Sequence, residues 1–282
     1  MSAQVFFGVG AGRCGTMSLA NWLSSEPGVQ CLHEGKERRL TEPGEQWLPF
    51  LTLQNYAAYK APETAVDLLR QTRGGMPELA AERGLAHLGD VAYNYAPFVH
   101  ALPTLFPAAR LVVLVRDGRD FVRSVVTDET PDPTPVGWLD DDREMDRVER
   151  FIALGRLRPV PGSDEARTWP EWSLVEKNAW LWAETYRVIL DGMSQWPEDQ
   201  VKLVRFEDLM ADIPGVYAEI RAFLGIDGPI GPDTERLLTT RINERRRRVL
   251  PPPSEWSDEI RADFDRRADA MMRRLGYRSD RG

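Results

Sequence analysis

Residues 5–19 constrain the fold most strongly, because an apolar run there breaks into a glycine-rich turn and then opens into a helix-like segment. The stretch reads Val-Phe-Phe-Gly-Val-Gly-Ala-Gly-Arg-Cys-Gly-Thr-Met-Ser-Leu. Its glycines let backbone N–H groups turn inward without Cβ clashes, and such a nest at a helix N-terminus binds anions. Arg13, Thr16 and Ser18 can add side-chain donors. The segment predicts a phosphate-binding loop, but not a Walker A loop, because Thr16 follows Gly15 where that pattern has Lys.

A second apolar run, residues 110–115, ends in alternating charges that begin with Arg116 and Asp117. Ser124 lies eight positions beyond Arg116, which is two helical turns if a helix starts near Asp117. Arg116 at the end of a strand and Ser124 on the following helix would then hold a second anion. Two phosphate sites at the ends of two strands suit a nucleotide that is phosphorylated in two separate places.

Short apolar strands alternate with helical segments along the chain, which favours one α/β domain with a central parallel sheet flanked by helices. A chain of 282 residues is long enough for one such domain. Ligands of these sheets collect beyond the carboxyl ends of the strands, where both phosphate sites fall. We expect strands near 4–9, 29–32, 87–91, 110–115 and 201–205. We expect helices near 16–25, 62–72, 95–105, 118–127, 142–155, 173–195, 213–224 and 257–275.

Charge and composition exclude several classes of protein. A net charge of −8 argues against nucleic acid as a partner, since neutralising phosphates demands a basic surface. Two cysteines, Cys14 and Cys31, offer no disulfide framework. The chain opens without a basic n-region and has no apolar run of membrane-spanning length, so a cytoplasmic protein with no membrane partner is expected. Lysine supplies only four of the 36 basic residues, a bias that suggests a GC-rich bacterial genome.

The two motifs together resemble those of the sulfotransferases that use 3′-phosphoadenosine-5′-phosphosulfate (PAPS). The first motif of that family holds the 5′-phosphosulfate. The second motif, Arg-Asp-x-Arg-Asp with a Ser eight residues after its first Arg, holds the 3′-phosphate. Further matches lie at 105–107, 201–209, 223–226 and 275–277, so the resemblance spans most of the chain outside 36–86 and 129–172. It is closer to the carbohydrate and tyrosylprotein branch than to the cytosolic phenol and steroid branch.

The resemblance implies a P-loop-NTPase-like sulfotransferase architecture in a single domain, 1–282, with 36–86 and 128–170 as acceptor-side insertions. The implied donor is PAPS, the product is 3′,5′-adenosine bisphosphate (PAP), and no metal is expected. The implied partner is a small-molecule or carbohydrate hydroxyl acceptor. Backbone groups of the loop would cradle the 5′ side, and Ser18 would add its hydroxyl; the loop residues are Gly12, Arg13, Cys14, Gly15, Thr16 and Met17. Arg116 and Ser124 would bind the 3′-phosphate, and Phe206 would stack beside the adenine where relatives often have Tyr.

The catalytic residues follow from the same resemblance. Arg13 is expected to stabilise the charge on the leaving phosphate, as in the relatives that sulfate tyrosine. Glu34, just past the second strand, matches the catalytic base of the carbohydrate and tyrosylprotein branch, and His33 is its rival. One departure concerns the Gly-Asp-Lys that commonly follows the third strand, because here Gly89-Asp90-Val91 has no lysine. Either Arg13 carries more of the charge stabilisation, or an arginine from another segment substitutes, with Arg241 and Arg245 expected over the cofactor.

Several alternatives stay open. The glycine loop alone also fits a tight strand–helix turn, and Arg116 and Asp117 also fit a surface ion pair with Arg119 or Asp120. The tryptophans at 169, 172, 180 and 182 and Tyr186 fit a stacking platform, although the spacing of Trp182 and Tyr186 favours core packing. A non-catalytic nucleotide-binding protein is a competing function, and a P-loop kinase is another. A carbohydrate, a phenol and a secondary-metabolite alcohol all fit as acceptor.

Overall fold

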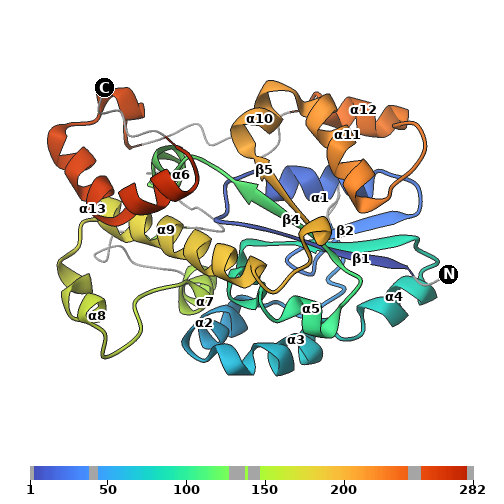
Figure 1. Ribbon diagram of the computed structural model, residues 1–282, viewed down its shortest axis with the longest axis horizontal. Helices are drawn as coiled ribbons and strands as arrows, with labels where there is room; N and C mark the ends of the chain where they lie inside the picture. Colours follow the sequence, from blue (N-terminus) through green and yellow to red (C-terminus); the bar gives the residue numbers. More distant parts are fainter. Residues whose placement is uncertain (1–2, 38–43, 127–136, 139–146, 241–248, 278–282) are drawn as a thin grey trace.

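A five-stranded, wholly parallel sheet forms the centre of the protein (Figure 1). The computed structural model describes residues 3–37, 44–126, 137–138, 147–240 and 249–277. The strands are β1 (Gln4–Gly10), β2 (Val29–His33), β3 (His87–Val91), β4 (Arg110–Val115) and β5 (Val201–Arg205), in the spatial order β2-β3-β1-β4-β5. All five strands expected from the sequence are confirmed. Strands β2 and β3 lie on one side of β1, and the later strands β4 and β5 lie on the other. The strand order therefore reverses at β1, and ligands of such sheets usually bind at this point.

The central strands β1 and β4 are buried on both faces, which is why they are near-continuous apolar runs, whereas the edge strand β5 is only partly buried. In β1, Val5, Phe7 and Val9 point into one core cluster, and Phe6 points into the other. This alternation is the two-residue period of a strand with a packed layer on each side. Helices α1, α10, α11 and α12 cover one face, and α2, α3, α5 and α9 pack against the other (Figure 1).

Most of the long helices begin and end close to the expected residues. They are α1 (Thr16–Ser24), α3 (Ala65–Arg73), α6 (Gly118–Val125), α9 (Leu174–Met193), α11 (Ile213–Leu224) and α13 (Asp258–Arg274). Helix α7 (Arg147–Gly155) occupies the end of the expected 142–155, whose first residues lie outside the described part of the chain. The sequence did not predict the helices α2 (Thr52–Lys60), α4 (Met76–Glu82), α8 (Asp164–Thr168), α10 (Phe206–Ala211) and α12 (Pro232–Leu238).

The helix expected over 95–105 is wrong. The chain instead forms a 3₁₀ segment, η2 (Tyr93–Phe98), and then a short helix, α5 (Leu102–Leu105). Pro97 lies inside η2 and Pro103 lies at the start of α5. Because proline has no backbone N–H and clashes with the preceding turn, a continuous α-helix cannot pass through this region. The remaining 3₁₀ turns are η1 (Pro62–Thr64), η3 (Trp169–Glu171), η4 (Glu198–Gln200) and η5 (Pro253–Glu255).

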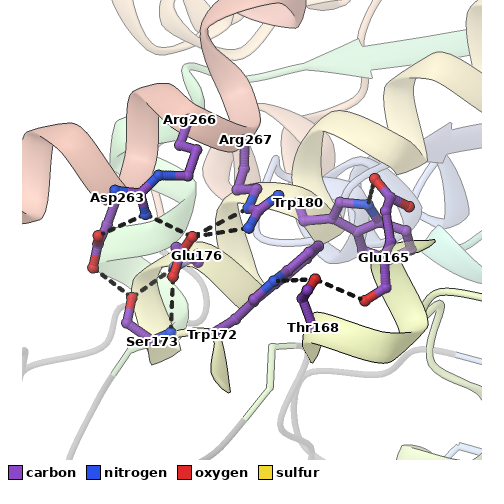
Figure 2. A network of polar contacts seen from close by, with 9 residues as sticks. All are labelled: Glu165, Thr168, Trp172, Ser173, Glu176, Trp180, Asp263, Arg266 and Arg267. Carbon is purple, nitrogen blue, oxygen red and sulfur yellow. Dashed lines mark hydrogen bonds and ion pairs between the residues drawn. The ribbon is translucent and has the colours of Figure 1, made fainter. Parts of the chain in front are cut away.

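Helix α13 clamps the start of α9 through a polar network (Figure 2). Ser173 and Glu176 form a capping box at the N-terminus of α9. The Glu176 carboxylate also accepts hydrogen bonds from Arg266 Nη1 at 2.7 Å and from Arg267 Nη2 at 3.1 Å. The Arg267 guanidinium lies 3.5 Å from the centre of the Trp172 ring. The network fixes the position of α9, the helix that reaches the carboxyl edge of the sheet.

None of the described helices combines the length and the apolar character that a bilayer span requires.

Candidate active site

The glycine-rich loop, the turn after β2 and the segment after β4 meet at one edge of the sheet. Parallel strands place all their carboxyl ends on the same side. Gly10 at the end of β1 pairs with Leu114 near the end of β4, so the two following segments start side by side. His33 at the end of β2 pairs with Val91 at the end of β3. The topology therefore gathers residues 11–16, 33–36 and 116–124 into one region.

The loop after β1 has the conformation of an anion-binding nest. Gly12, Arg13 and Gly15 have φ angles of 80°, 53° and 91°, in the left-handed region. Gly15 is the N-cap of α1, and no side chain caps this helix. The first N–H groups of α1 are thus available to an anion, and the helix dipole favours negative charge there. The predicted phosphate cradle is consistent with this geometry.

Arg13 contacts both Arg116 and Ser124. The Arg13 Nε donates a hydrogen bond of 3.1 Å to the hydroxyl of Ser124, and the Arg116 Nη1 donates to the carbonyl oxygen of Arg13. The Arg116 guanidinium also lies 4.7 Å from the centre of the Phe206 ring. The contacts bring two arginines, one from the loop after β1 and one from the segment after β4, to the same edge of the sheet. The Ser124 hydroxyl, expected to work with Arg116, is a partner of Arg13 in this structure.

The other residues that were predicted to bind the cofactor differ in how much of each side chain is exposed to a ligand. The side chain of Cys14 is fully buried beneath the loop, and burial raises the pKa of its thiol to about 11. Cys14 therefore offers only backbone groups to a ligand. Met17 and Ser18 are partly exposed on the first turn of α1, and Thr16 is buried. Phe206, the first residue of α10, lies against the loop, since a Cβ at Gly15 would come within 3.3 Å of its ring.

Arg241 and Arg245, expected over the cofactor, lie outside the described residues.

Glu34 lies at the tip of a tight turn. His33 and Lys36 exchange backbone hydrogen bonds of 2.8 and 3.2 Å, and the two residues between them have positive φ angles, 59° at Glu34 and 74° at Gly35. Among the residues the structure describes, Arg13 and Glu34 are the two non-glycine residues with positive φ. A left-handed non-glycine residue costs about 1–3 kcal/mol and is typical of functional sites. Both strained residues are among the three that the sequence nominated for catalysis; the third, His33, has no positive φ.

His33 is oriented toward the glycine-rich loop. It is buried, and its Nε2 lies 3.3 Å from the Thr16 hydroxyl. This contact joins the end of β2 to the start of α1. Glu34 is instead only partly buried. The carboxylate is thus the more accessible of the two candidate bases.

A buried arginine that the sequence did not predict, Arg156, lies on the Glu34 side of the region. Its side chain packs over the Trp138 ring with 4.9 Å between guanidinium carbon and ring centre. Burial and the negative charge of Glu34 raise the pKa of Tyr93, whereas the positive charge of Arg156 lowers it. The charges of Glu34 and Arg156 therefore both influence the pKa of the Tyr93 hydroxyl. Arg156 belongs to a segment that matches no recognised motif, so no sequence signal distinguished it from the other arginines.

Tyr186 connects the two segments that are predicted to bind anions, the loop after β1 and the segment after β4. Its hydroxyl donates to the Leu114 carbonyl at 2.9 Å and accepts from the amides of Arg116 at 3.2 Å and Ala11 at 3.4 Å. Tyr186 and its neighbour Trp182 are fully buried, so core packing, the favoured interpretation of these two aromatics, is confirmed. The Trp182 indole also donates to the Arg116 carbonyl at 3.0 Å. Spacing along α9 predicted the packing but not these hydrogen bonds.

Glu207 and Asp117 hold the segment after β4 on its other side. Glu207 accepts from the Asp117 amide at 2.9 Å and from the Tyr277 hydroxyl at 2.9 Å. Asp117 caps α6 and pairs with Arg119 at 2.6 Å. The ion pair between Asp117 and Arg119, one of the alternative interpretations of this motif, is therefore present.

Within the described ranges, no group of three or more His, Cys, Asp or Glu side chains is arranged to hold a metal ion.

Comparison with known proteins gives a family match. Residues 5–154 match the profile of the Sulfotransferase family. A sulfotransferase from Alicyclobacillus acidocaldarius is a similar solved structure, with 19% identity, 99% of this chain and 98% of that chain covered, and a TM-score of 0.49. The mouse sulfotransferase SULT7A1 complexed with PAP is similar at 12% identity, with 96% of this chain and 85% of that chain covered and a TM-score of 0.49. No curated protein matches the chain.

Proposed function

Because this chain belongs to the sulfotransferase family, we propose that it transfers the sulfuryl group of PAPS to a hydroxyl acceptor, with Arg13 and Glu34 as its catalytic residues. The observation that carries the proposal is the contact of Arg13 with both Arg116 and Ser124. It joins the loop after β1 to the segment after β4 in one cationic site. A single adenosine bisphosphate has anionic groups at both ends and would satisfy both.

The residues present fit such a ligand. The left-handed loop and the uncapped N-terminus of α1 would hold the 5′ side through backbone groups of residues 12–17, and the Ser18 hydroxyl would add a donor. Arg116 would hold the 3′-phosphate, supported by the Phe206 ring under its guanidinium. Ser124 would join it once an anion draws the Arg13 guanidinium away from the serine hydroxyl. Phe206 would also offer its ring to the adenine.

The proposed chemistry assigns one task to each catalytic side chain. PAPS supplies the sulfuryl group and leaves as PAP. Glu34 would accept the proton of the acceptor hydroxyl as its oxygen bonds to sulfur, in line with the bond to the 5′-phosphate that breaks. Arg13 would stabilise the negative charge that appears on this phosphate, and a preorganised donor of this kind is worth about 3–4 kcal/mol in the transition state. Positioning and electrostatics would supply the rest, as in phosphoryl transfer.

Glu34 is preferred to His33 as the base because of where each side chain lies. The His33 ring is buried against Thr16 beside the loop. Glu34 is partly exposed, strained and close enough to Tyr93 to perturb its pKa. The same surroundings contain Arg156, which we propose as the cation in place of the family's missing lysine, acting on the transferring group from the acceptor side.

Two variants test the proposal together. Glu34→Gln keeps the size of the side chain and should leave PAP affinity unchanged, while turnover falls by roughly 100-fold or more, the usual contribution of a general base. Arg116→Ala should weaken PAP binding by roughly tenfold or more, since a charge-assisted phosphate contact is lost. Affinity is measured by calorimetry with PAP in the presence of EDTA. Turnover is measured with [35S]-PAPS against pools of carbohydrates, phenols and other alcohols.

The outcomes separate the competing functions. PAP binding with no transfer to any pool would favour a non-catalytic nucleotide-binding protein. Binding that needs Mg²⁺ and prefers ATP would favour a kinase. Normal turnover of Glu34→Gln would remove this residue as the base and move attention to His33.

A further inference from the structure

We propose that a buried network of Asp90, Arg73 and Tyr95 positions the turn that carries Glu34. Through this network, the position of the catalytic base depends on the position of the acceptor-side helices. The inference rests on the proposed role of Glu34 as the base. It assigns a function to the aspartate of the Gly89-Asp90 motif, which lacks the family's lysine. All three members are positioning residues, because none needs to touch a substrate.

The turn itself requires external support. Its two central residues, Glu34 and Gly35, both have positive φ angles, as in a type I′ turn. Such turns strongly favour Asn-Gly or Asp-Gly, and a glutamate at the first central position is strained. A strained residue persists only where the surrounding structure determines its conformation. The contacts of the neighbouring Gly35 show what does so here.

Gly35 is held from two sides. Its amide donates to Asp90 Oδ1 at 3.0 Å, and its carbonyl accepts from the amides of Trp47 and Leu48, each at 3.0 Å. A Cβ at Gly35 would lie 2.5 Å from the Leu48 carbonyl oxygen, so this approach needs glycine. The Gln46 side chain adds a hydrogen bond to the Glu34 carbonyl at 3.3 Å. The turn is clamped between β3 and residues 46–48.

Asp90 is itself held by charge and hydrogen bonds. Its Oδ2 accepts from the Tyr95 hydroxyl at 2.7 Å and pairs with Arg73 Nη2 at 2.9 Å. The side chains of Asp90 and Arg73 are fully buried. A buried carboxylate with a charged partner and further hydrogen bonds has no freedom to rotate, so Oδ1 is fixed in the direction of Gly35.

Arg73 extends the network into the segment before α2. At the end of α3, it donates from Nη1 to the Pro49 carbonyl at 2.8 Å. The residues that clamp Gly35 therefore come from the same segment, 46–49, that Arg73 ties to Asp90. The family resemblance implies that residues 36–86, which include this segment and α2 to α4, lie on the acceptor side. A movement of these helices would be transmitted to Glu34 through two sets of contacts.

A matched pair of double variants tests the positioning role. Arg73→Gln with Asp90→Asn removes both buried charges but keeps an oxygen that accepts from Gly35. Arg73→Met with Asp90→Leu removes the charges and the oxygen together. We expect the Met/Leu variant to lose roughly 20- to 100-fold in kcat and the Gln/Asn variant no more than about fivefold, because small displacements of a catalytic group are costly. PAP affinity should stay within about twofold in both, because the network lies apart from the PAP site.

Hydrogen exchange of the Gly35 amide gives a readout that needs no activity. The Gly35 amide should exchange faster in the Met/Leu variant than in the Gln/Asn variant. The acidic limb of the kcat–pH profile should also shift in the Met/Leu variant. Tyr95→Phe keeps the ion pair and should show a smaller increase in exchange, which preserves the test if a double variant fails to fold.

Two different results would overturn the inference, one by refuting the positioning role and the other by refuting Glu34 as the base. Unchanged Gly35 exchange in both the Met/Leu variant and Tyr95→Phe would refute the positioning while leaving the proposed function intact. Normal turnover of Glu34→Gln in the parent protein would refute the role of the base, and the link to catalysis with it.

Discussion

Replacing Tyr186 with Phe would test how the loop after β1 and the segment after β4 are held together. The aromatic ring would keep its contact with Trp182, where the two ring centres are 5.3 Å apart. Only the hydroxyl would be lost. That hydroxyl joins the Leu114 carbonyl at the end of β4 to the amides of Arg116 and Ala11.

The magnitude follows from these contacts. The bonds to Leu114 at 2.9 Å and from Arg116 at 3.2 Å are of ordinary length, whereas the one from Ala11 at 3.4 Å is weak. Each ordinary bond contributes about 1 kcal/mol, and a buried polar group left without a partner adds about 1–3 kcal/mol. We expect the free energy of unfolding to fall by about 3–5 kcal/mol. PAP affinity should fall roughly fivefold, which corresponds to about 1 kcal/mol of lost preorganisation.

Urea unfolding followed by tryptophan fluorescence measures the first quantity, and calorimetry with PAP measures the second. Tyr217→Phe is the matched control. Tyr217 is also fully buried, and its hydroxyl donates to the Glu26 carboxylate at 2.9 Å and to the Trp22 carbonyl at 3.1 Å, away from the strand ends. It should lose comparable stability without losing PAP affinity. A loss under about 0.5 kcal/mol in Tyr186→Phe, or equal loss of affinity in both variants, would refute the reasoning.

Three further variants test other parts of the structure. Arg156→Gln should lower kcat by roughly tenfold and leave PAP affinity unchanged. The control is Arg221→Gln, which removes a buried arginine far from the site and should reduce stability alone. Equal kcat values in the two variants would refute the role of Arg156. Since burial raises the pKa of Cys14 from 9.0 to about 11, the neutral thiol favours the fold below pH 9, and about 3 kcal/mol of that stability should be lost between pH 9 and 11. Cys14→Ala should flatten this dependence, measured by urea unfolding at each pH; an unchanged slope would contradict it. Glu176→Ala should lower the free energy of unfolding by about 1–3 kcal/mol, because the α9 cap and the contacts to two arginines are lost together. An unchanged urea midpoint would show that α13 holds α9 by apolar packing alone.

Strands β1 and β4 were predictable because each is a buried apolar run that begins with a polar residue. The glycine loop was predictable for a similar reason, since its conformation depends on residues adjacent in sequence. The expected helix over 95–105 failed because apolar periodicity outweighed two prolines whose effect on the backbone is decisive. Short helices such as α8 and α10 carry too few residues for a period of 3.6 to be recognised.

Contacts between distant residues were beyond the reach of sequence patterns. Ser124 was assigned to the Arg116 phosphate site by its spacing, yet its hydroxyl accepts from Arg13, which lies 111 positions away. Arg73 and Arg156 come from segments without any recognisable motif, and only folding shows that both are buried near the Glu34 turn. An arginine in a sequence carries no sign of whether it will be solvated or enclosed.

By itself, the sequence determined which backbone segments become strands and where the glycine-rich turn lies between β1 and α1, because both depend on the chemistry of neighbouring residues. The tertiary structure alone decided which side chains face one another across the carboxyl edge of the sheet. The pairing of β1 with β3 and β4 brings the Arg13 loop, the Glu34 turn and Arg116 together, and the buried partners Asp90 and Tyr186 hold them there. Burial and long-range hydrogen bonding arise only when the sheet assembles, so no local pattern encodes them.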